Sequence, residues 1–93
     1  MISTNEYFDG KVKSLAFSNS QGQVTSGVMD IGEYVFGTTQ HEIMKVISGE
    51  LSVKLPQQDN FVSFGAGSEF EVPANAEFTV IVKEQTAYLC FYS

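Results

Sequence analysis

The 93-residue sequence contains no arginine and no tryptophan, and all five of its basic residues are lysines. Eleven acidic residues oppose these lysines, which leaves a formal net charge of −6. Affinity for nucleic acid rests on Lys and Arg side chains that neutralise phosphates. The charge balance therefore argues against a nucleic-acid-binding protein.

Long hydrophobic segments are also missing. The run at 78–82 is interrupted by Thr79, whereas a membrane helix needs about 20 consecutive apolar residues. The first six residues have neither the basic flank nor the apolar stretch of a secretory signal. Cys90 is the single cysteine and cannot form an internal disulfide. We therefore expect a cytoplasmic protein that does not enter a membrane.

Apolar residues make up 43% of the chain and charged residues 17%, which is too apolar for a disordered protein. The length predicts one domain spanning residues 1–93. A fold of this size buries only about 60–65% of the surface of its extended chain. Its core is thin, so association with a second copy would stabilise it.

The hydrophobic pattern is that of β-strands, and no segment has helical spacing. Short runs rich in Val, Ile, Phe and Tyr alternate with turn residues about every 8–12 positions, which is typical of a sandwich or barrel. The predicted strands cover residues 11–17, 24–29, 33–36, 42–48, 51–55, 61–64, 69–72, 77–82 and 86–92.

The segment 42–48 carries apolar side chains on both faces of the predicted strand. Met44 and Val46 lie on one face, and Ile43 and Ile47 lie on the other. A solvated outer face should be polar. Two explanations remain open, namely that the N-terminal segment covers the second face or that this face forms a dimer interface.

Two short motifs resemble the signatures of the cupin fold. Glu42 is followed by six residues and Gly49, and Gly67 is followed by five residues, Pro73, one residue and Asn75. Gly67 permits entry into a strand, Pro73 ends the strand, and Asn75 suits a turn position with positive φ. The resemblance implies an all-β fold, a single cupin-type jelly-roll barrel of short antiparallel strands.

The metal ligands of the cupin pattern are mostly absent. Metal-binding cupins direct two histidines, a glutamate and a third histidine into the barrel. Phe36 and Thr38 stand where the first two histidines are expected, and Phe78 stands in place of the third. Glu42 alone matches, and the single histidine, His41, should point to the opposite face of the strand. One carboxylate and one imidazole do not form a metal site, so a metal-dependent oxygenase or isomerase is disfavoured.

Four longer segments, residues 5–15, 32–36, 42–49 and 87–90, resemble the small bacterial pyrimidine/purine nucleoside phosphorylase family. This resemblance implies an enzyme of the pentosyltransferase type that cleaves both purine and pyrimidine nucleosides with inorganic phosphate. The products are the free base and ribose 1-phosphate, and no metal or other cofactor is expected. The alternative is a non-catalytic cupin-type module that binds a small molecule.

An arginine-free phosphorylase must hold phosphate with lysine, His41, hydroxyls or backbone N–H groups. The candidates are Lys45, Thr38, Thr39 and the backbone around Gly37 or 65–67. We expect a homodimer, whose partner subunit could supply the missing cation.

Glu42 is the candidate catalytic residue. If it points inward, its carboxylate could bind ribose hydroxyls or stabilise the positive charge that develops at C1′. A raised pKa would instead let it act as an acid toward the base. The structural alternative is a buried glutamate bonded to a tyrosine hydroxyl or to the backbone.

Aromatic faces stack on any nucleobase, so aromatic side chains could serve purines and pyrimidines alike. The alternative is that they fill the core, as Met44 and Cys90 are expected to do. The candidate substrate-binding residues are Tyr34, Phe36, Thr38, Met44, Lys45, Phe78 and Tyr88.

Overall fold

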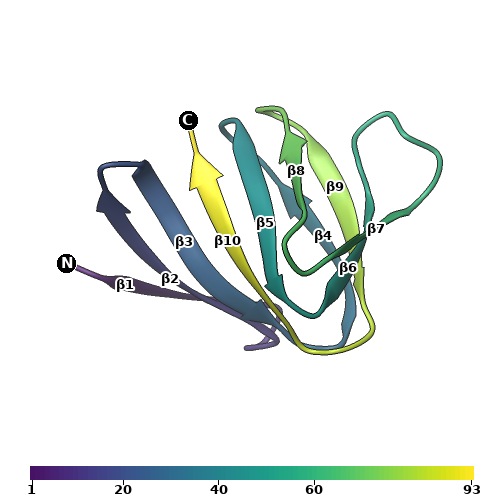
Figure 1. Cartoon of the computed structure of the whole chain (residues 1–93), viewed down its shortest axis with the longest axis horizontal. Coiled ribbons are helices and arrows are strands. Elements are labelled where there is room, and N and C mark those ends of the chain that lie inside the picture. Colours follow the sequence, from purple (N-terminus) through teal and green to yellow (C-terminus); the bar gives the residue numbers. More distant parts are fainter.

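The computed structural model describes residues 1–93 and consists of ten antiparallel β-strands joined by short turns and loops (Figure 1). No part of the chain forms a helix with the length and apolarity of a membrane span. The strands are β1 (Ser3–Tyr7), β2 (Val12–Asn19), β3 (Gly22–Met29), β4 (Gly32–Gly37), β5 (Glu42–Ser48), β6 (Glu50–Lys54), β7 (Val62–Gly65), β8 (Glu69–Val72), β9 (Glu77–Val82) and β10 (Thr86–Tyr92).

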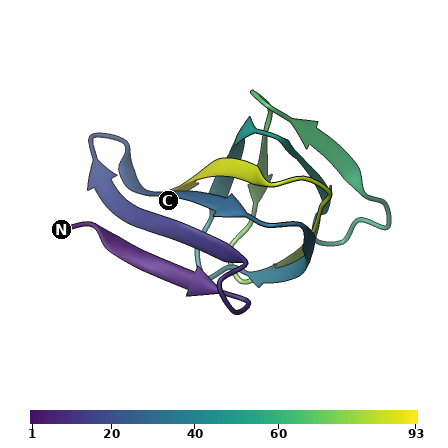
Figure 2. The same cartoon turned by 90° about the horizontal axis from the view of Figure 1, so that it is seen from below.

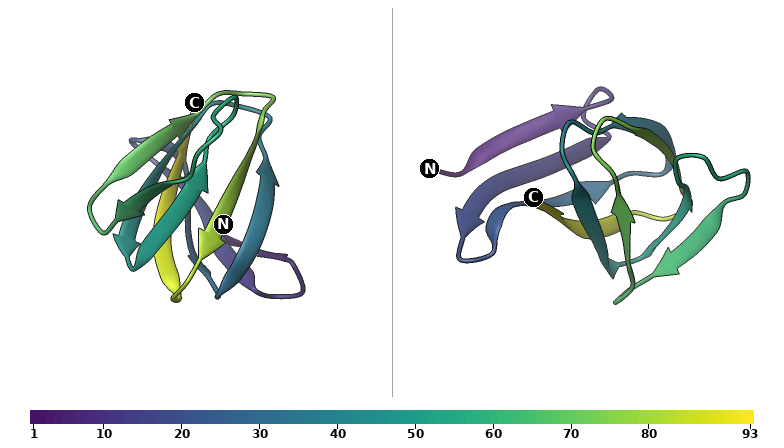
Figure 3. Two further views of the ribbon diagram at one scale, coloured as in Figure 1. Left: turned by 90° about the vertical axis from the view of Figure 1, so that its right-hand side faces the viewer. Right: turned by 90° about the horizontal axis from the view of Figure 1, so that it is seen from above.

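The strands form two sheets that face each other across one core (Figure 3, left). The larger sheet has the order β1-β2-β3-β10-β5-β8, and the smaller has the order β4-β9-β6-β7. Alternate residues of each strand point inward, as the burial of Phe78, Val80 and Val82 on β9 illustrates. The all-β cupin class is confirmed. The antiparallel strands form two facing sheets, which are not closed into one continuous barrel.

The structure adds a strand that the hydrophobic pattern did not predict. β1 is mostly polar and exposed, and it pairs with β2 from Ser3↔Ala16 to Tyr7↔Val12. It lies at the far edge of the larger sheet, separated from β5 by three strands. The prediction that the N-terminal segment covers the second apolar face of β5 is therefore wrong. Ile47 remains 47% exposed on that face.

The cupin-like turn residues have the predicted conformations. Gly67 has φ +91° before β8, Pro73 directly follows the end of β8, and Asn75 has φ +57°. Gly49 has φ +97° in the turn between β5 and β6. These four residues end and reverse strands as their types dictate.

The sandwich has two distinct ends. At the upper end of Figure 1, β8 and β10 finish and β5 begins; at the lower end, β6 and β10 begin. The strands β1, β2 and β3 extend sideways beyond the smaller sheet, and the C-terminus of the chain lies next to this extension (Figure 2).

Candidate functional site

Glu42 begins β5 at the upper end and lies on the inner face of the larger sheet. Its cross-strand neighbours are Val72 on β8 and Tyr92 on β10. The Glu42 side chain is half-buried, and its Oε1 accepts a hydrogen bond from Cys90 Sγ at 3.4 Å. The predicted inward orientation of Glu42 is confirmed.

Burial raises the pKa of the Glu42 carboxyl above its usual value. The hydrogen bond from Cys90 and the neighbouring His41 act in the opposite direction and favour the charged form. The partner of this carboxylate is thus a thiol rather than a tyrosine hydroxyl or a backbone group. A thiol is a weak donor, so the carboxylate retains capacity to accept further hydrogen bonds.

The Cys90 thiol is not suited to act as a nucleophile. The side chain is only 2% exposed, and burial, followed by the nearby Glu42 charge, raises its pKa to about 12. The thiolate, which is the reactive form, is therefore scarce at neutral pH. Cys90 packs in the core, as predicted.

A small cavity of about 50 Å³ lies between the sheets below Glu42. A water molecule in the liquid occupies about 30 Å³, so this space is far too small for a nucleoside. Phe36 and Phe78, two of its walls, stack on each other with ring centroids 5.6 Å apart. The residues that line this inner cavity are Met29, Phe36, Met44, Phe78, Tyr88, Cys90 and Tyr92.

The candidate residues Phe36, Met44, Phe78 and Tyr88 are therefore brought together, but as walls of the core. Burial raises the pKa of the Tyr88 hydroxyl to about 12, which keeps it neutral. The ring of Tyr88 lies against Gly27, where an added Cβ would come within 2.7 Å of the hydroxyl oxygen. The structure shows a packing role for this group, and contact with a substrate remains a prediction.

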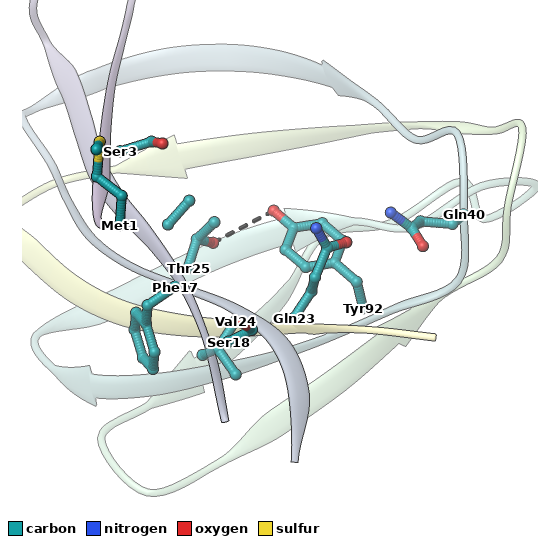
Figure 4. Close-up of a pocket in the computed structure, with 10 residues that line it drawn as sticks. Met1, Ser3, Phe17, Ser18, Gln23, Val24, Thr25, Gln40 and Tyr92 are labelled. Carbon is teal, nitrogen blue, oxygen red and sulfur yellow. Dashed lines mark hydrogen bonds between the residues drawn. The ribbon is translucent and has the colours of Figure 1, made fainter. Parts of the chain in front are cut away.

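A larger cavity of about 320 Å³ opens at the upper end, beside the extension formed by β1, β2 and β3 (Figure 4). No side chain lining it carries a charge. Six of its ten lining residues bear a hydroxyl or a carboxamide, namely Ser3, Ser18, Gln23, Thr25, Gln40 and Tyr92. We call this space the upper cavity.

Tyr92 lines both cavities. Its hydroxyl and Thr25 Oγ1 share a hydrogen bond of 3.2 Å (Figure 4). Burial raises the pKa of the Tyr92 hydroxyl, so this group too stays protonated. Glu42 lies directly opposite Tyr92 on the neighbouring strand, although Glu42 itself lines neither cavity.

His41 lies at the rim, one residue before Glu42, and turns away from it. Its Nδ1 bonds Ser93 Oγ and its Nε2 bonds Glu71 Oε2, both at 2.8 Å. Glu71 pairs with Ile43 on the outer face of the sheet, so the predicted opposite orientation of His41 is confirmed. No group of three or more His, Cys, Asp or Glu side chains is positioned to hold a metal ion.

Three other candidates lie away from Glu42 or are already engaged. Tyr34 donates its hydroxyl to the carbonyl of Asp30 at 2.6 Å, near the lower end. The Thr38 hydroxyl donates to the carbonyl of Pro73 at 2.7 Å and is buried. Lys45 alternates with Met44 and so lies on the outer face of the sheet.

The backbone candidates for phosphate binding are also engaged within the protein. The N–H of Gly67 donates to the carbonyl of Val46, and the N–H of Ser68 donates to that of Gly65. The N–H of Thr38 donates to the carbonyl of Ala76 at 2.8 Å. Both ring nitrogens of His41 are also engaged, by Ser93 and Glu71.

Sequence reasoning did not single out the residues of the upper cavity. They come from β1, β2, β3, β10 and the loop before β5, and no motif links them. Tyr92 alone was predictable as an inward-facing residue, because it alternates along the same strand with Tyr88 and Cys90. Serines and glutamines near strand ends read as ordinary turn or surface residues.

Comparison with known proteins shows which family shares these features. The family model described as Pyrimidine/purine nucleoside phosphorylase matches residues 2–92. A Pyrimidine/purine nucleoside phosphorylase of Pseudomonas syringae pv. tomato is 60% identical over 99% of each chain. One from Rhodopirellula baltica is 55% identical over 99% of this chain and 100% of its own length.

Solved structures agree with the fold. A Vibrio parahaemolyticus protein described as being of unknown function superposes with a TM-score of 0.94 and 45% identity, covering 100% of this chain and 99% of that one. An RmlC-like cupin from Shewanella frigidimarina gives a TM-score of 0.78 at 19% identity, covering 99% and 83%, and supports the fold alone. The half-buried carboxylate at the end of a cupin-like sandwich thus belongs to a chain of the pyrimidine/purine nucleoside phosphorylase family.

Proposed function

We propose that this protein catalyses the phosphate-dependent cleavage of purine and pyrimidine nucleosides. The observation that carries the proposal is the family match over residues 2–92, with relatives 55–60% identical over the whole chain. In this reaction a phosphate oxygen forms a bond to C1′ while the bond from C1′ to the base nitrogen breaks. The electron pair leaves with the base, which takes up a proton, and ribose 1-phosphate remains. Because a pentosyl group passes to phosphate, the enzyme would be a pentosyltransferase.

Glu42 is the residue we place at the ribose. Its ionised carboxylate accepts hydrogen bonds from the ribose hydroxyls, and it stabilises the positive charge that develops at C1′ as the base departs. The thiol of Cys90 holds one carboxylate oxygen in position. Few other groups compete for the carboxylate, which supports this role.

Phosphate is held, in this proposal, without arginine and without a metal. None of the five lysines lines either the upper or the inner cavity. The N-terminal ammonium of Met1, which lines the upper cavity, and His41 at the rim are the candidate cations of this chain, and the partner subunit is the other source. We expect the enzyme to act in the cytoplasm, where its single thiol stays reduced.

We also propose a homodimer formed through the outer face of the larger sheet. Leu15 and Val28 are 47% and 49% exposed there. Across β2, β3 and β10, the cross-strand row that contains Leu15 ends at Leu89, and the row that contains Val28 ends at Ala87. Within these strands each row also carries one polar residue, Ser26 in the first and Lys13 in the second, and the exposed apolar side chains are the candidate contacts of a partner subunit. Val28→Glu should shift the sedimentation coefficient from dimer to monomer. Val35→Glu, on the outer face of the smaller sheet at 52% exposure, should leave it unchanged.

The activity test is an assay of base release from uridine, inosine and adenosine with and without phosphate, after treatment with a chelator. Release that requires phosphate supports the proposal. Binding of nucleoside without any phosphate-dependent release would instead identify a small-molecule binding module.

A further inference from the structure

Of the two cavities that Tyr92 lines, only the upper cavity is large enough for part of a nucleoside. Its volume of about 320 Å³ is more than six times that of the inner cavity at about 50 Å³. Small-molecule sites typically measure about 300–1,000 Å³. We propose, on the basis of the function proposed above, that the upper cavity binds the heterocyclic base of the substrate.

The chemistry of the lining suits a neutral base rather than phosphate. The cavity wall presents hydroxyls and two carboxamides but no cationic or anionic side chain. Nucleobases are neutral and carry N–H donors, carbonyl acceptors and ring nitrogens on their edges. The one charged group at the wall is the N-terminal ammonium of Met1, whereas the rest of the polar lining offers a base neutral donors and acceptors.

Gln23 and Gln40 explain why one cavity would accept both classes of base. Each carboxamide offers a donor and an acceptor, and a rotation of its terminal torsion exchanges the two. Both side chains are exposed to solvent. The side-chain hydrogen bonds near the cavity, Thr25 with Tyr92, His41 with Ser93 and Cys90 with Glu42, involve neither of them. Their polar groups are thus available to purine and pyrimidine edges alike.

The position of the cavity places the sugar near the carboxylate. Gln40 lies two residues before Glu42, and Tyr92, which lines the cavity, is the cross-strand partner of Glu42. Directly opposed residues have Cβ atoms about 4.5–5.5 Å apart. In the view of Figure 4, the side chains form a row from Thr25 to Gln40, with Tyr92 and Gln23 overlapping between them. A base bound along this row has its ribose within reach of Glu42.

The test compares the double variant Gln23→Ala/Gln40→Ala with wild type and with the matched control Gln58→Ala. Gln58 is an exposed glutamine in the loop between β6 and β7, remote from the cavity. Calorimetric Kd values for uridine and inosine without phosphate, and KM values in the assay, are measured for each protein. One hydrogen bond between neutral groups contributes about two- to tenfold in affinity. The double variant should therefore bind both nucleosides about 5- to 100-fold more weakly, with KM for phosphate unchanged and Gln58→Ala like wild type.

The outcomes separate this inference from the proposed activity. A double variant with wild-type Kd and KM for both nucleosides overturns the cavity assignment, even if wild type releases base normally. If wild type releases no base but binds nucleoside, and the double variant loses that binding, the activity fails while the assignment holds. A wild-type protein that binds no nucleoside overturns both. Thermal denaturation checks that each variant is folded.

Discussion

The two ends of the sandwich use their polar side chains differently. At the lower end the buried Thr86 hydroxyl accepts a hydrogen bond from the N–H of Glu50 at 3.1 Å. The same hydroxyl lies 3.1 Å from the carbonyl oxygen of Glu50 and 2.8 Å from that of Glu84. At the upper end the carboxamides of Gln23 and Gln40 are exposed, and Glu42 has only a thiol partner. The Thr38 hydroxyl at the upper end likewise bonds the backbone of Pro73 and Ala76. The two ends therefore differ in Gln23, Gln40 and Glu42, whose side chains keep hydrogen-bonding capacity for a ligand.

The largest expected effect is on kcat, which should fall when a glutamate is changed at the upper end and not when one is changed at the lower end. Glu42→Gln keeps the size of the side chain but removes the charge that we place beside C1′, so kcat should fall about 100-fold or more. Glu50→Gln, the matched change at the lower end, should retain wild-type kcat, because Glu50 contributes backbone rather than side-chain bonds there. Steady-state assays with uridine and inosine measure both. A Glu42→Gln enzyme with near-native kcat would remove Glu42 from the mechanism.

A second prediction tests how tightly the lower end is packed. Gly49 has φ +97°, and an added Cβ would contact the Thr86 hydroxyl and approach the Gln85 carbonyl oxygen at 3.0 Å. Gly49→Ala should therefore lower the free energy of unfolding by about 1–3 kcal/mol.

The control for Gly49→Ala is Gly65→Ala. Gly65 has no positive φ, and no atom lies within 4 Å of its added Cβ. Urea denaturation of both variants measures the difference in unfolding free energy. Equal values for the two would contradict the close approach of the β5–β6 turn to Thr86.

A third prediction compares one hydroxyl at each end. Thr86→Val removes a fully buried hydroxyl and leaves the part-buried N–H of Glu50 without its partner, which should cost about 1–3 kcal/mol of stability. Thr25→Val removes a half-buried hydroxyl that lines the upper cavity, where water can replace it, so it should cost less than about 1 kcal/mol. Urea denaturation at one protein concentration measures both. The contrast between the two ends is lost if Thr25→Val is the more damaging change.

Local signals in the sequence predicted much of the fold. Gly67, Pro73 and Asn75 have backbone preferences that act within a few residues, so their turn was predictable. The parity of β5 likewise predicted that Glu42 points inward and Lys45 outward. The polar strand β1 was missed because its pairing with β2, rather than its own hydrophobicity, forms it.

The candidate site was less predictable, since it depends on which strands lie next to each other. Thr38 is a plausible anion ligand by type, yet its hydroxyl bonds the backbone of Pro73, 35 residues away. Gln23 and Gln40 meet at one cavity only because the extension of β3 lies beside the loop before β5. Such long-range proximity leaves no pattern in a single sequence.

The smallest expected effect concerns the pH dependence of stability. Burial raises the folded-state pKa of Glu42, so charging this residue opposes folding. Its contribution to stability is fully present below the unfolded-state pKa and is lost as the pH rises through the folded-state pKa. Relative to wild type, Glu42→Gln should therefore gain stability on going from about pH 4 to pH 7, after any constant offset from the altered bond to Cys90. Urea denaturation of both proteins at the two pH values measures this change. If wild type instead gains stability relative to Glu42→Gln as the pH rises, the carboxylate is better stabilised in the folded protein than in water.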